Sequence, residues 1–182
     1  MSRPGLRRVL HAASAGLLLF VPLWSWSVFR AVATATACTA VVLEAVRLTF
    51  PVASKALARV VPVYRQTEHS RPSGAMWLAI GFGLAAWFPP RLPALALLVG
   101  ALADPAASFV GERWGNRSAR KSAVGSLAFF VVAWAAALAV GTLWYKGLAI
   151  AAVATALERW SGPLDDNLLV APGTALTAWL LG

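Results

Sequence analysis

Asp104 is the most unusual acidic residue in a chain that is 59% hydrophobic and only 13% charged. It lies within an apolar stretch and is followed by Ser108, Gly111 and Gly115. On a helix these residues share one stripe, because spacings near multiples of 3.6 return to the same face. A carboxylate at hydrocarbon depth is costly unless it faces a wet cavity, a cation or a metal ion. A helix-packing face would explain the glycines but not the acid, so we expect Asp104 to take part in chemistry.

A group of cations follows this stripe and precedes the next apolar segment. Helix N-termini present free backbone N–H groups, which add to the charge of Arg and Lys side chains in binding phosphate. The Walker-type glycine pattern is absent, so side-chain cations must bind any nucleotide phosphate. Contact with lipid headgroups is the alternative for such a loop. The candidate phosphate-binding residues are Arg113, Arg117, Arg120 and Lys121, with Ser122 as the expected N-cap.

The turn between the last two apolar segments holds a third polar group, Glu158 followed by Asp165, Asp166 and Asn167. Adjacent carboxylates in a tight turn are hard oxygen ligands suited to Mg²⁺. Asp and Asn are also common N-cap residues, so these residues could instead cap the last helix, and Asn167 fits that role. We expect a metal-binding or catalytic role for the two aspartates.

Four further polar residues lie near the ends of apolar segments. His11 lies one turn from Arg8 on the expected first helix. Glu44 and Arg47 are three residues apart, a spacing at which two side chains can pair on a helix. Arg71 lies in a long polar loop. Taken alone, each is more typical of a boundary anchor or a surface ion pair.

The segments that carry these residues are long and apolar. Soluble domains are about 45–50% apolar and 25% charged, so the composition, with a mean hydropathy of +0.70, predicts an all-α, polytopic integral membrane protein. Unbroken apolar runs favour helices over the alternating strands of a barrel. We expect one domain, 1–182. About seven transmembrane helices are expected, over residues 11–29, 31–46, 74–89, 93–111, 123–145, 147–160 and 168–181.

Positive charge is distributed unevenly over the predicted loops. With the N-terminus placed in the cytoplasm, only Arg30, Arg91 and Lys146 of the 16 cations face outward, in line with the positive-inside rule. All seven acidic residues fall on or near the cytoplasmic side, so we expect the active site there. The net charge of +9 favours anionic lipid over nucleic acid as a partner. The excess of Arg over Lys hints at a GC-rich prokaryote and hence at its plasma membrane.

Together these residues resemble the CTP-dependent lipid kinase family, which includes dolichol kinase, phytol kinase and CTP-dependent diacylglycerol kinase. CDP-diacylglycerol synthase is more distantly similar. The Asp104 stripe and the Lys121-Ser122-x-x-Gly125-Ser126 segment carry most of the resemblance. It extends in family order over nearly the whole chain, through Arg-Arg-x-x-His11, Glu44-x-x-Arg47, Arg71-x-x-Gly74 and Asp165-Asp166-Asn167.

The resemblance implies transfer of the CTP γ-phosphoryl group to a lipid hydroxyl. Asp104 with Asp165 or Asp166, and Glu158, would hold Mg²⁺ on the triphosphate, and Asp166 or Asp104 would accept the hydroxyl proton. Lys121 and the arginines would neutralise the phosphates. The glycines would let the nucleotide or a neighbouring helix approach closely; they are Gly111, Gly115 and Gly125. The lipid head would be contacted by His11, Glu44, Arg47 and Arg71.

Two other functions compete with lipid phosphorylation. Cytidylyl transfer from CTP to phosphatidate uses the same nucleotide and metal but attacks the α-phosphate. A membrane transporter or scaffold could also contain intramembrane acids and broken helices. The predicted outer turns hold one cation each and are otherwise apolar, which counts against a transported solute. The acceptor alcohol and the oligomeric state are left open by the sequence.

Overall fold

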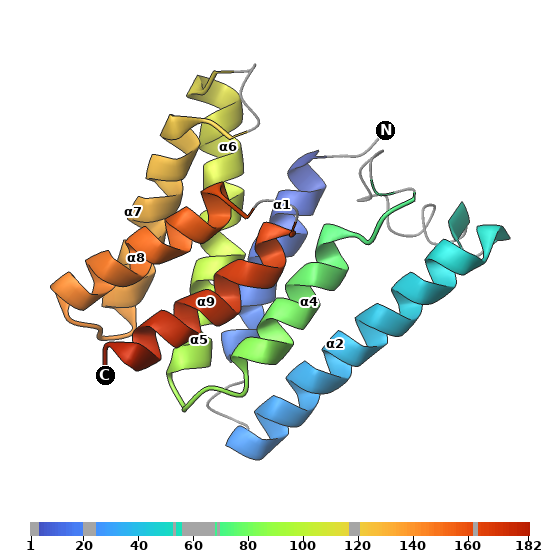
Figure 1. Ribbon diagram of the computed structural model, residues 1–182, viewed down its shortest axis with the longest axis horizontal. Helices are drawn as coiled ribbons and strands as arrows, with labels where there is room; N and C mark the ends of the chain where they lie inside the picture. Colours follow the sequence, from blue (N-terminus) through green and yellow to red (C-terminus); the bar gives the residue numbers. More distant parts are fainter. Residues whose placement is uncertain are drawn as a thin grey trace.

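The computed structural model describes residues 4–19, 25–52, 54–55, 68, 70–116, 121–161 and 164–182. All regular structure in these residues is helical, so the expected all-α class is confirmed for the described part of the chain. The chain folds back and forth, and the C-terminal ends of α2, α6 and α8 lie on the same side as the N-terminal ends of α4, α7 and α9 (Figure 1).

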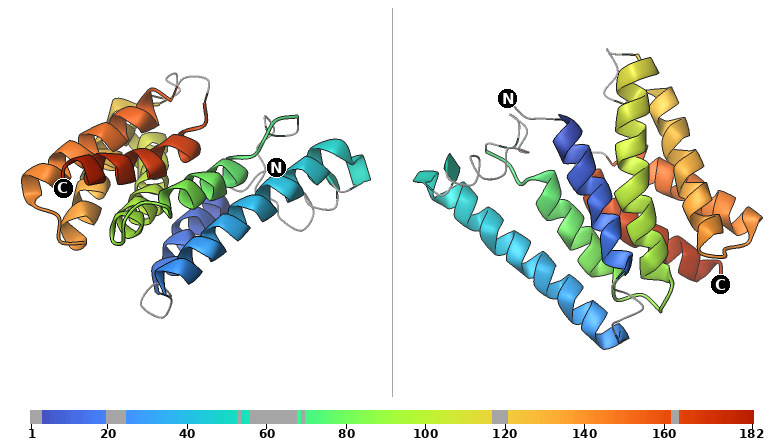
Figure 2. Two further views of the ribbon diagram at one scale, coloured as in Figure 1. Left: turned by 60° about the horizontal axis from the view of Figure 1, so that its bottom comes forward. Right: turned by 180° about the vertical axis from the view of Figure 1, so that it is seen from behind.

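Neighbouring helices pack side by side from one edge of the molecule to the other. The order across the bundle is α2 (Trp26–Thr49), α4 (Gly74–Ala85), α9 (Asp166–Leu180), α8 (Trp144–Arg159), α7 (Ala123–Ala139) and α6 (Asp104–Trp114). The N-terminal helix α1 (Pro4–Ala13) continues into the 3₁₀ helix η1 (Ser14–Leu19) and packs on the far side against α6 (Figure 2). Buried side chains from these helices form two apolar clusters rich in alanine.

One long helix changes its winding in the middle. Helix α5 (Leu92–Leu98) runs through the π-helical turn η4 (Val99–Ala103) directly into α6. Single π turns within α-helices occur frequently at functional sites. This turn ends immediately before Asp104, so it determines the direction in which that carboxylate leaves the helix.

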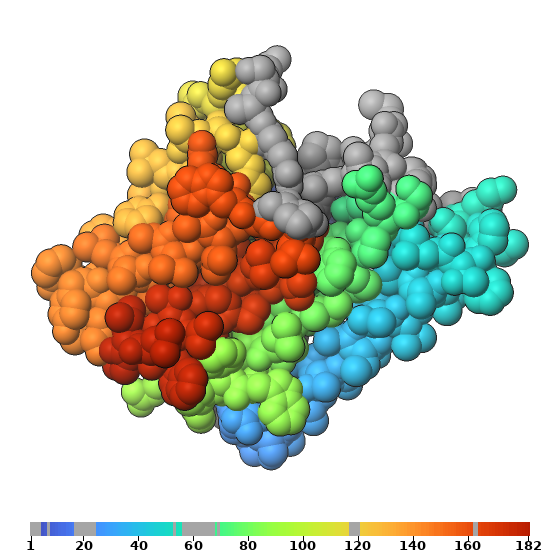
Figure 3. Space-filling view, viewed as in Figure 1, coloured from blue at the N-terminus to red at the C-terminus, as the bar shows by residue number. Residues whose placement is uncertain are grey.

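Two described helical segments are long and apolar enough to cross a membrane, Trp26–Thr49 and Leu92–Trp114. Two further apolar helices, Gly74–Ala85 and Ala123–Ala139, are shorter. The expectation of about seven transmembrane helices is therefore not confirmed. Helix α2 forms one edge of the molecule (Figure 3), and only 11% of its most apolar window is buried.

The predicted boundary between the first two spans is wrong. The sequence places a turn at Arg30, but Arg30 lies inside α2, which begins at Trp26. Ser25 caps this helix by accepting a hydrogen bond from the Val28 N–H. The Arg30 charge is accommodated without a turn, because its guanidinium donates to the Ala86 carbonyl and lies over the Trp26 and Trp87 rings.

A buried ion pair joins the end of α2 to the start of α4. Arg47 donates to both carboxylate oxygens of Glu44, at 2.7 and 3.0 Å. Arg47 also donates to the Arg71 carbonyl at 2.8 Å, and Glu44 accepts from the Ser73 N–H at 2.5 Å. Glu44 and Arg47 are 4% and 3% exposed. This Glu44–Arg47 pair therefore fixes residues 71–74 and the N-terminus of α4 against α2.

Glu44→Gln tests this pair, because it keeps the side-chain shape but leaves the buried Arg47 guanidinium without its counter-charge. Removing one partner of a buried ion pair costs about 3–5 kcal/mol, so the melting temperature in detergent should fall by at least about 6 °C. Glu112→Gln is the matched control, since the Glu112 side chain is 59% exposed and its partner Arg8 is half-buried, and ion pairs open to solvent contribute about 1 kcal/mol or less. Equal melting temperatures for the two variants would contradict a structural role for the Glu44–Arg47 pair.

Candidate active site

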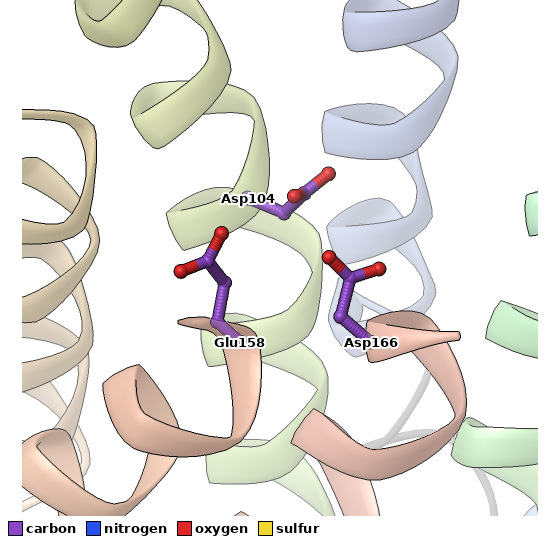
Figure 4. A group of neighbouring side chains, drawn as sticks. All are labelled: Asp104, Glu158 and Asp166. Carbon is purple, nitrogen blue, oxygen red and sulfur yellow. The ribbon is translucent and has the colours of Figure 1, made fainter. Parts of the chain in front are cut away.

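Three carboxylates from distant parts of the sequence converge at the π turn within one long helix and at the ends of two others. Asp104 begins α6, Glu158 lies at the end of α8, and Asp166 begins α9. One oxygen from each lies within 4.8 Å of the others, and the side chains point toward one another (Figure 4). The predicted convergence of Asp104 with the Asp165–Asp166 turn is therefore present through Asp166.

Lys121 joins two of these carboxylates. Its Nζ lies 2.8 Å from Glu158 Oε1 and 2.5 Å from Asp166 Oδ2, and it also donates to the Glu158 carbonyl. Lys121 immediately precedes Ser122, the N-cap of α7, whose hydroxyl accepts from the Gly125 N–H at 3.0 Å. The expected cap is thus confirmed, and it places the Lys121 ammonium beside the ends of α8 and α9.

The charge of this group fits a divalent cation. Three carboxylates and one ammonium sum to −3 + 1, or −2, which one divalent ion would neutralise. Glu158 is 6% exposed, and its Oε2 is buried without a hydrogen-bond partner among the described residues. A buried unpaired carboxylate oxygen is unfavourable, and three hard oxygen donors suit Mg²⁺. Asp104, Glu158 and Asp166 can therefore hold such an ion.

Asp165 lies beside this group but makes different contacts. It caps α9, because its Oδ1 accepts from the Asn167 N–H at 3.0 Å and from the Asn167 side-chain amide at 2.7 Å. The capping role expected for Asn167 is thus filled by Asp165. Burial and the adjacent Asp166 charge raise the pKa of Asp165. Burial also opposes ionisation of Asp166, but Lys121 outweighs it and lowers the pKa of Asp166.

The glycines of the Asp104 stripe let two helices approach closely. A Cβ on Gly125 would lie 2.9 Å from the Ala107 carbonyl oxygen and 3.4 Å from Gly111 Cα, and a Cβ on Gly111 would lie 2.9 Å from Ser122 Oγ. A Cβ on Gly115 would also collide with Ser122. Of the two expected roles, approach of a helix or of a nucleotide, the contacts here are those of α6 against α7.

The other predicted site residues lie in different surroundings. His11 is buried against Asp104, with its Nδ1 3.5 Å from Asp104 Oδ2. Glu44, Arg47 and Arg71 meet in the cluster between α2 and α4. Arg113 is exposed, and its guanidinium lies over the Trp114 ring. Arg117 and Arg120 fall outside the described residues.

A small cavity of about 10 Å³, which has room for about one water molecule, lies at the carboxylates. The three acids and Asn167 line its polar side, and its remaining walls come from Leu78, Gly100, Phe129 and Val170. Sequence reasoning missed these four residues, because apolar side chains and a glycine in apolar helices carry no chemical signal. It also missed the contact of His11 with Asp104, although it placed His11 one turn from Arg8 on the expected first helix.

Comparison with known proteins gives one similar relative. The chain is 28% identical over 164 residues to CTP-dependent diacylglycerol kinase 1 of Schizosaccharomyces pombe, covering 76% of this chain and 74% of the relative. No family model and no solved structure matches the chain. The similarity supports the resemblance to CTP-dependent lipid kinases that the polar motifs suggested.

Proposed function

We propose that this protein transfers the γ-phosphoryl group of CTP to the hydroxyl group of a membrane lipid. The observation that carries the proposal is the convergence of Asp104, Glu158 and Asp166 around Lys121. Phosphoryl transfer depends mainly on positioning and on neutralising phosphate charge. The similarity to a CTP-dependent diacylglycerol kinase supports CTP as the donor and a lipid alcohol as the acceptor.

Asp104, Glu158 and Asp166 would hold Mg²⁺ at the site. When bound, Mg²⁺ neutralises triphosphate charge and orients the γ-phosphate. The unpaired Glu158 Oε2 offers a buried ligand atom for this purpose. Asp165 is assigned to capping α9, which keeps Asp166 in place for the site.

Lys121 and the start of α7 would bind the phosphates. The Lys121 ammonium pairs with both Glu158 and Asp166 and offsets one of their two negative charges. With the cation bound by the carboxylates, the same ammonium is free to donate to a γ-phosphate oxygen. At the start of α7 the Gly125 N–H donates to Ser122, and the N–H groups of Ala123 and Val124 would add to the positive potential beside Lys121. Further positive charge would come from Arg113 in the last turn of α6, and from Arg117 and Arg120, which follow α6 in sequence.

The chemical step needs a proton acceptor beside the lipid hydroxyl. The hydroxyl oxygen forms a bond to the γ-phosphorus while the bond from that phosphorus to the β,γ-bridging oxygen breaks. The hydroxyl proton passes to a carboxylate, Asp104 or Asp166, and CDP leaves with the electron pair of the broken bond. Asp104 suits this role because its side chain is 32% exposed, the most accessible of the three carboxylates.

The acceptor is a lipid whose hydroxyl reaches a pocket with apolar walls, either diacylglycerol or a polyprenol, dolichol or phytol type of alcohol. The hydroxyl group, which is about the size of a water molecule, would fit there between Leu78, Phe129 and Val170. We place the site at the cytoplasmic face of a plasma membrane, because 13 of the 16 cations lie on that side of the predicted topology. Arg71, which is exposed, would contact the lipid head, and the Glu44–Arg47 pair would act indirectly by holding residues 71–74.

Asp104→Asn tests the carboxylate site, because it keeps the shape of the side chain but removes its charge. We expect the rate of lipid phosphorylation to fall by at least about 100-fold, measured with radiolabelled CTP and a panel of diacylglycerol and isoprenoid alcohols. Glu112→Gln, on the exposed face of the same helix, should retain near wild-type activity. Product analysis decides the reaction type, since a kinase releases CDP and a cytidylyltransferase releases pyrophosphate. Wild-type activity in Asp104→Asn, or pyrophosphate as the product, would contradict the proposal.

Lys121→Met tests the proposed binding of phosphate by Lys121, because methionine keeps the length of the side chain but has no charge. We expect a drop of about 100-fold in kcat/KM for CTP, together with tighter binding of Mn²⁺ in the absence of nucleotide. The tighter binding follows because the ammonium no longer competes for Glu158 and Asp166.

Lys146→Met is the matched control for Lys121→Met. Lys146 donates to the Leu181 and Gly182 carbonyls and not to Asp104, Glu158 or Asp166. Its substitution should therefore change neither kcat/KM for CTP nor the affinity for Mn²⁺. Weaker Mn²⁺ binding in Lys121→Met would contradict the competition between ammonium and metal.

A further inference from the structure

The direction of the Asp104 side chain depends on the π turn η4. A π turn holds one more residue than an α turn, so it rotates everything that follows by roughly 100° relative to an uninterrupted α-helix. Asp104 is the first residue after η4 (Val99–Ala103). If this turn relaxed to an α turn, Asp104 would point away from Glu158 and Asp166, which approach it from α8 and α9 (Figure 4).

One carbonyl in this turn has no helical donor. In the π pattern the Gly100 carbonyl would accept from the residue five positions later, but that residue is Pro105, which has no N–H. Gly100 is buried, so water cannot replace the missing donor freely. The α winding would instead leave the Ala101 carbonyl facing Pro105 without a donor, so a donor supplied to Gly100 favours the π winding.

His11 supplies the missing donor. Its Nε2 lies 2.9 Å from the Gly100 oxygen, and because a carbonyl only accepts, Nε2 donates. The His11 ring is buried, 8% exposed, and its Nδ1 faces Asp104 Oδ2 at 3.5 Å. A single ring on α1 therefore touches both the turn and the carboxylate that the turn directs.

We propose that His11 is a positioning residue for the divalent-cation site. By donating to the Gly100 carbonyl it holds η4 in the π conformation, and η4 in turn directs Asp104 toward Glu158 and Asp166. The inference rests on the proposed metal site but not on the identity of the nucleotide or the lipid.

A purely structural role would be that His11 only attaches α1 to α6. Arg8 provides the matched comparison, because it lies one turn away on α1 and donates to Ser108 and pairs with Glu112, both on α6. Arg8→Met removes an α1–α6 contact without touching η4 or Asp104. The two roles therefore predict different effects on metal binding.

The test measures Mn²⁺ binding to the full chain in detergent by electron paramagnetic resonance, without nucleotide, alongside thermal unfolding. His11→Ala should weaken Mn²⁺ binding by about 10–100-fold, the usual effect of losing a residue that orients a metal ligand. His11→Gln places an amide N–H near the position of Nε2 and should recover most of the affinity. His11→Asn, whose shorter amide matches Nδ1 and cannot reach Gly100, should not. Arg8→Met should lower the melting temperature but keep the Mn²⁺ affinity within about twofold.

The inference is overturned if His11→Ala and Arg8→Met weaken Mn²⁺ binding equally, or if His11→Ala binds Mn²⁺ like the wild type while Asp104→Asn does not. If His11→Ala fails to fold, the Gln and Asn variants decide, and equal affinities for these two would refute it. Unchanged Mn²⁺ binding in Asp104→Asn would instead refute the proposed metal site itself.

Discussion

The contact of Lys121 with Glu158 and Asp166 is the interaction on which the rest of the site depends. Ionised carboxylates among apolar helices are costly unless they are paired, and Glu158 is nearly fully buried. The Lys121 ammonium pairs with two of the three carboxylates. The group of three carboxylates and one ammonium keeps a charge of −2, and Glu158 Oε2 has no partner among the described residues. In the proposed function, the remaining negative charge of this group is what would attract a divalent ion.

Helix ends position Lys121, Glu158 and Asp166, whereas Asp104 lies after the π turn inside the long α5–η4–α6 helix. Ser122 and Asp165 cap α7 and α9, and each cap places the charged residue next to it, Lys121 or Asp166, at the centre of the group. The close approach of α6 and α7 at Gly111 and Gly125 sets the depth of Asp104 relative to Lys121. The Ser122 cap and the two glycines, which suggested a phosphate-binding site in the sequence, thus fix the backbone positions of the charged residues.

Much of this arrangement could be predicted from the sequence. Charged residues are few in an apolar chain, and each is costly unless it is paired or functional. Asp104, Lys121, Glu158 and Asp166 were all identifiable in this way, as were the helical class and the Ser122 cap. What failed were features that depend on tertiary contacts. Arg30 did not end a helix because Trp26, Trp87 and the Ala86 carbonyl accommodate its charge. Asp165, rather than Asn167, caps α9, and the sequence did not distinguish them because both residue types cap helices. The π turn and its bond to His11 could not be anticipated, since they join α1 to a segment far along the chain.

The central claim is that Asp104, Glu158 and Asp166 bind one divalent cation beside Lys121. The most direct measurement is anomalous diffraction from crystals grown with Mn²⁺ and a CTP analogue that carries a methylene group between the β- and γ-phosphorus atoms. The account predicts one strong anomalous peak in contact with all three carboxylates, with Lys121 Nζ moved from Asp166 to a γ-phosphate oxygen. A nucleotide bound elsewhere, or a bound nucleotide with no peak between the carboxylates and Lys121 still on both Glu158 and Asp166, would contradict it.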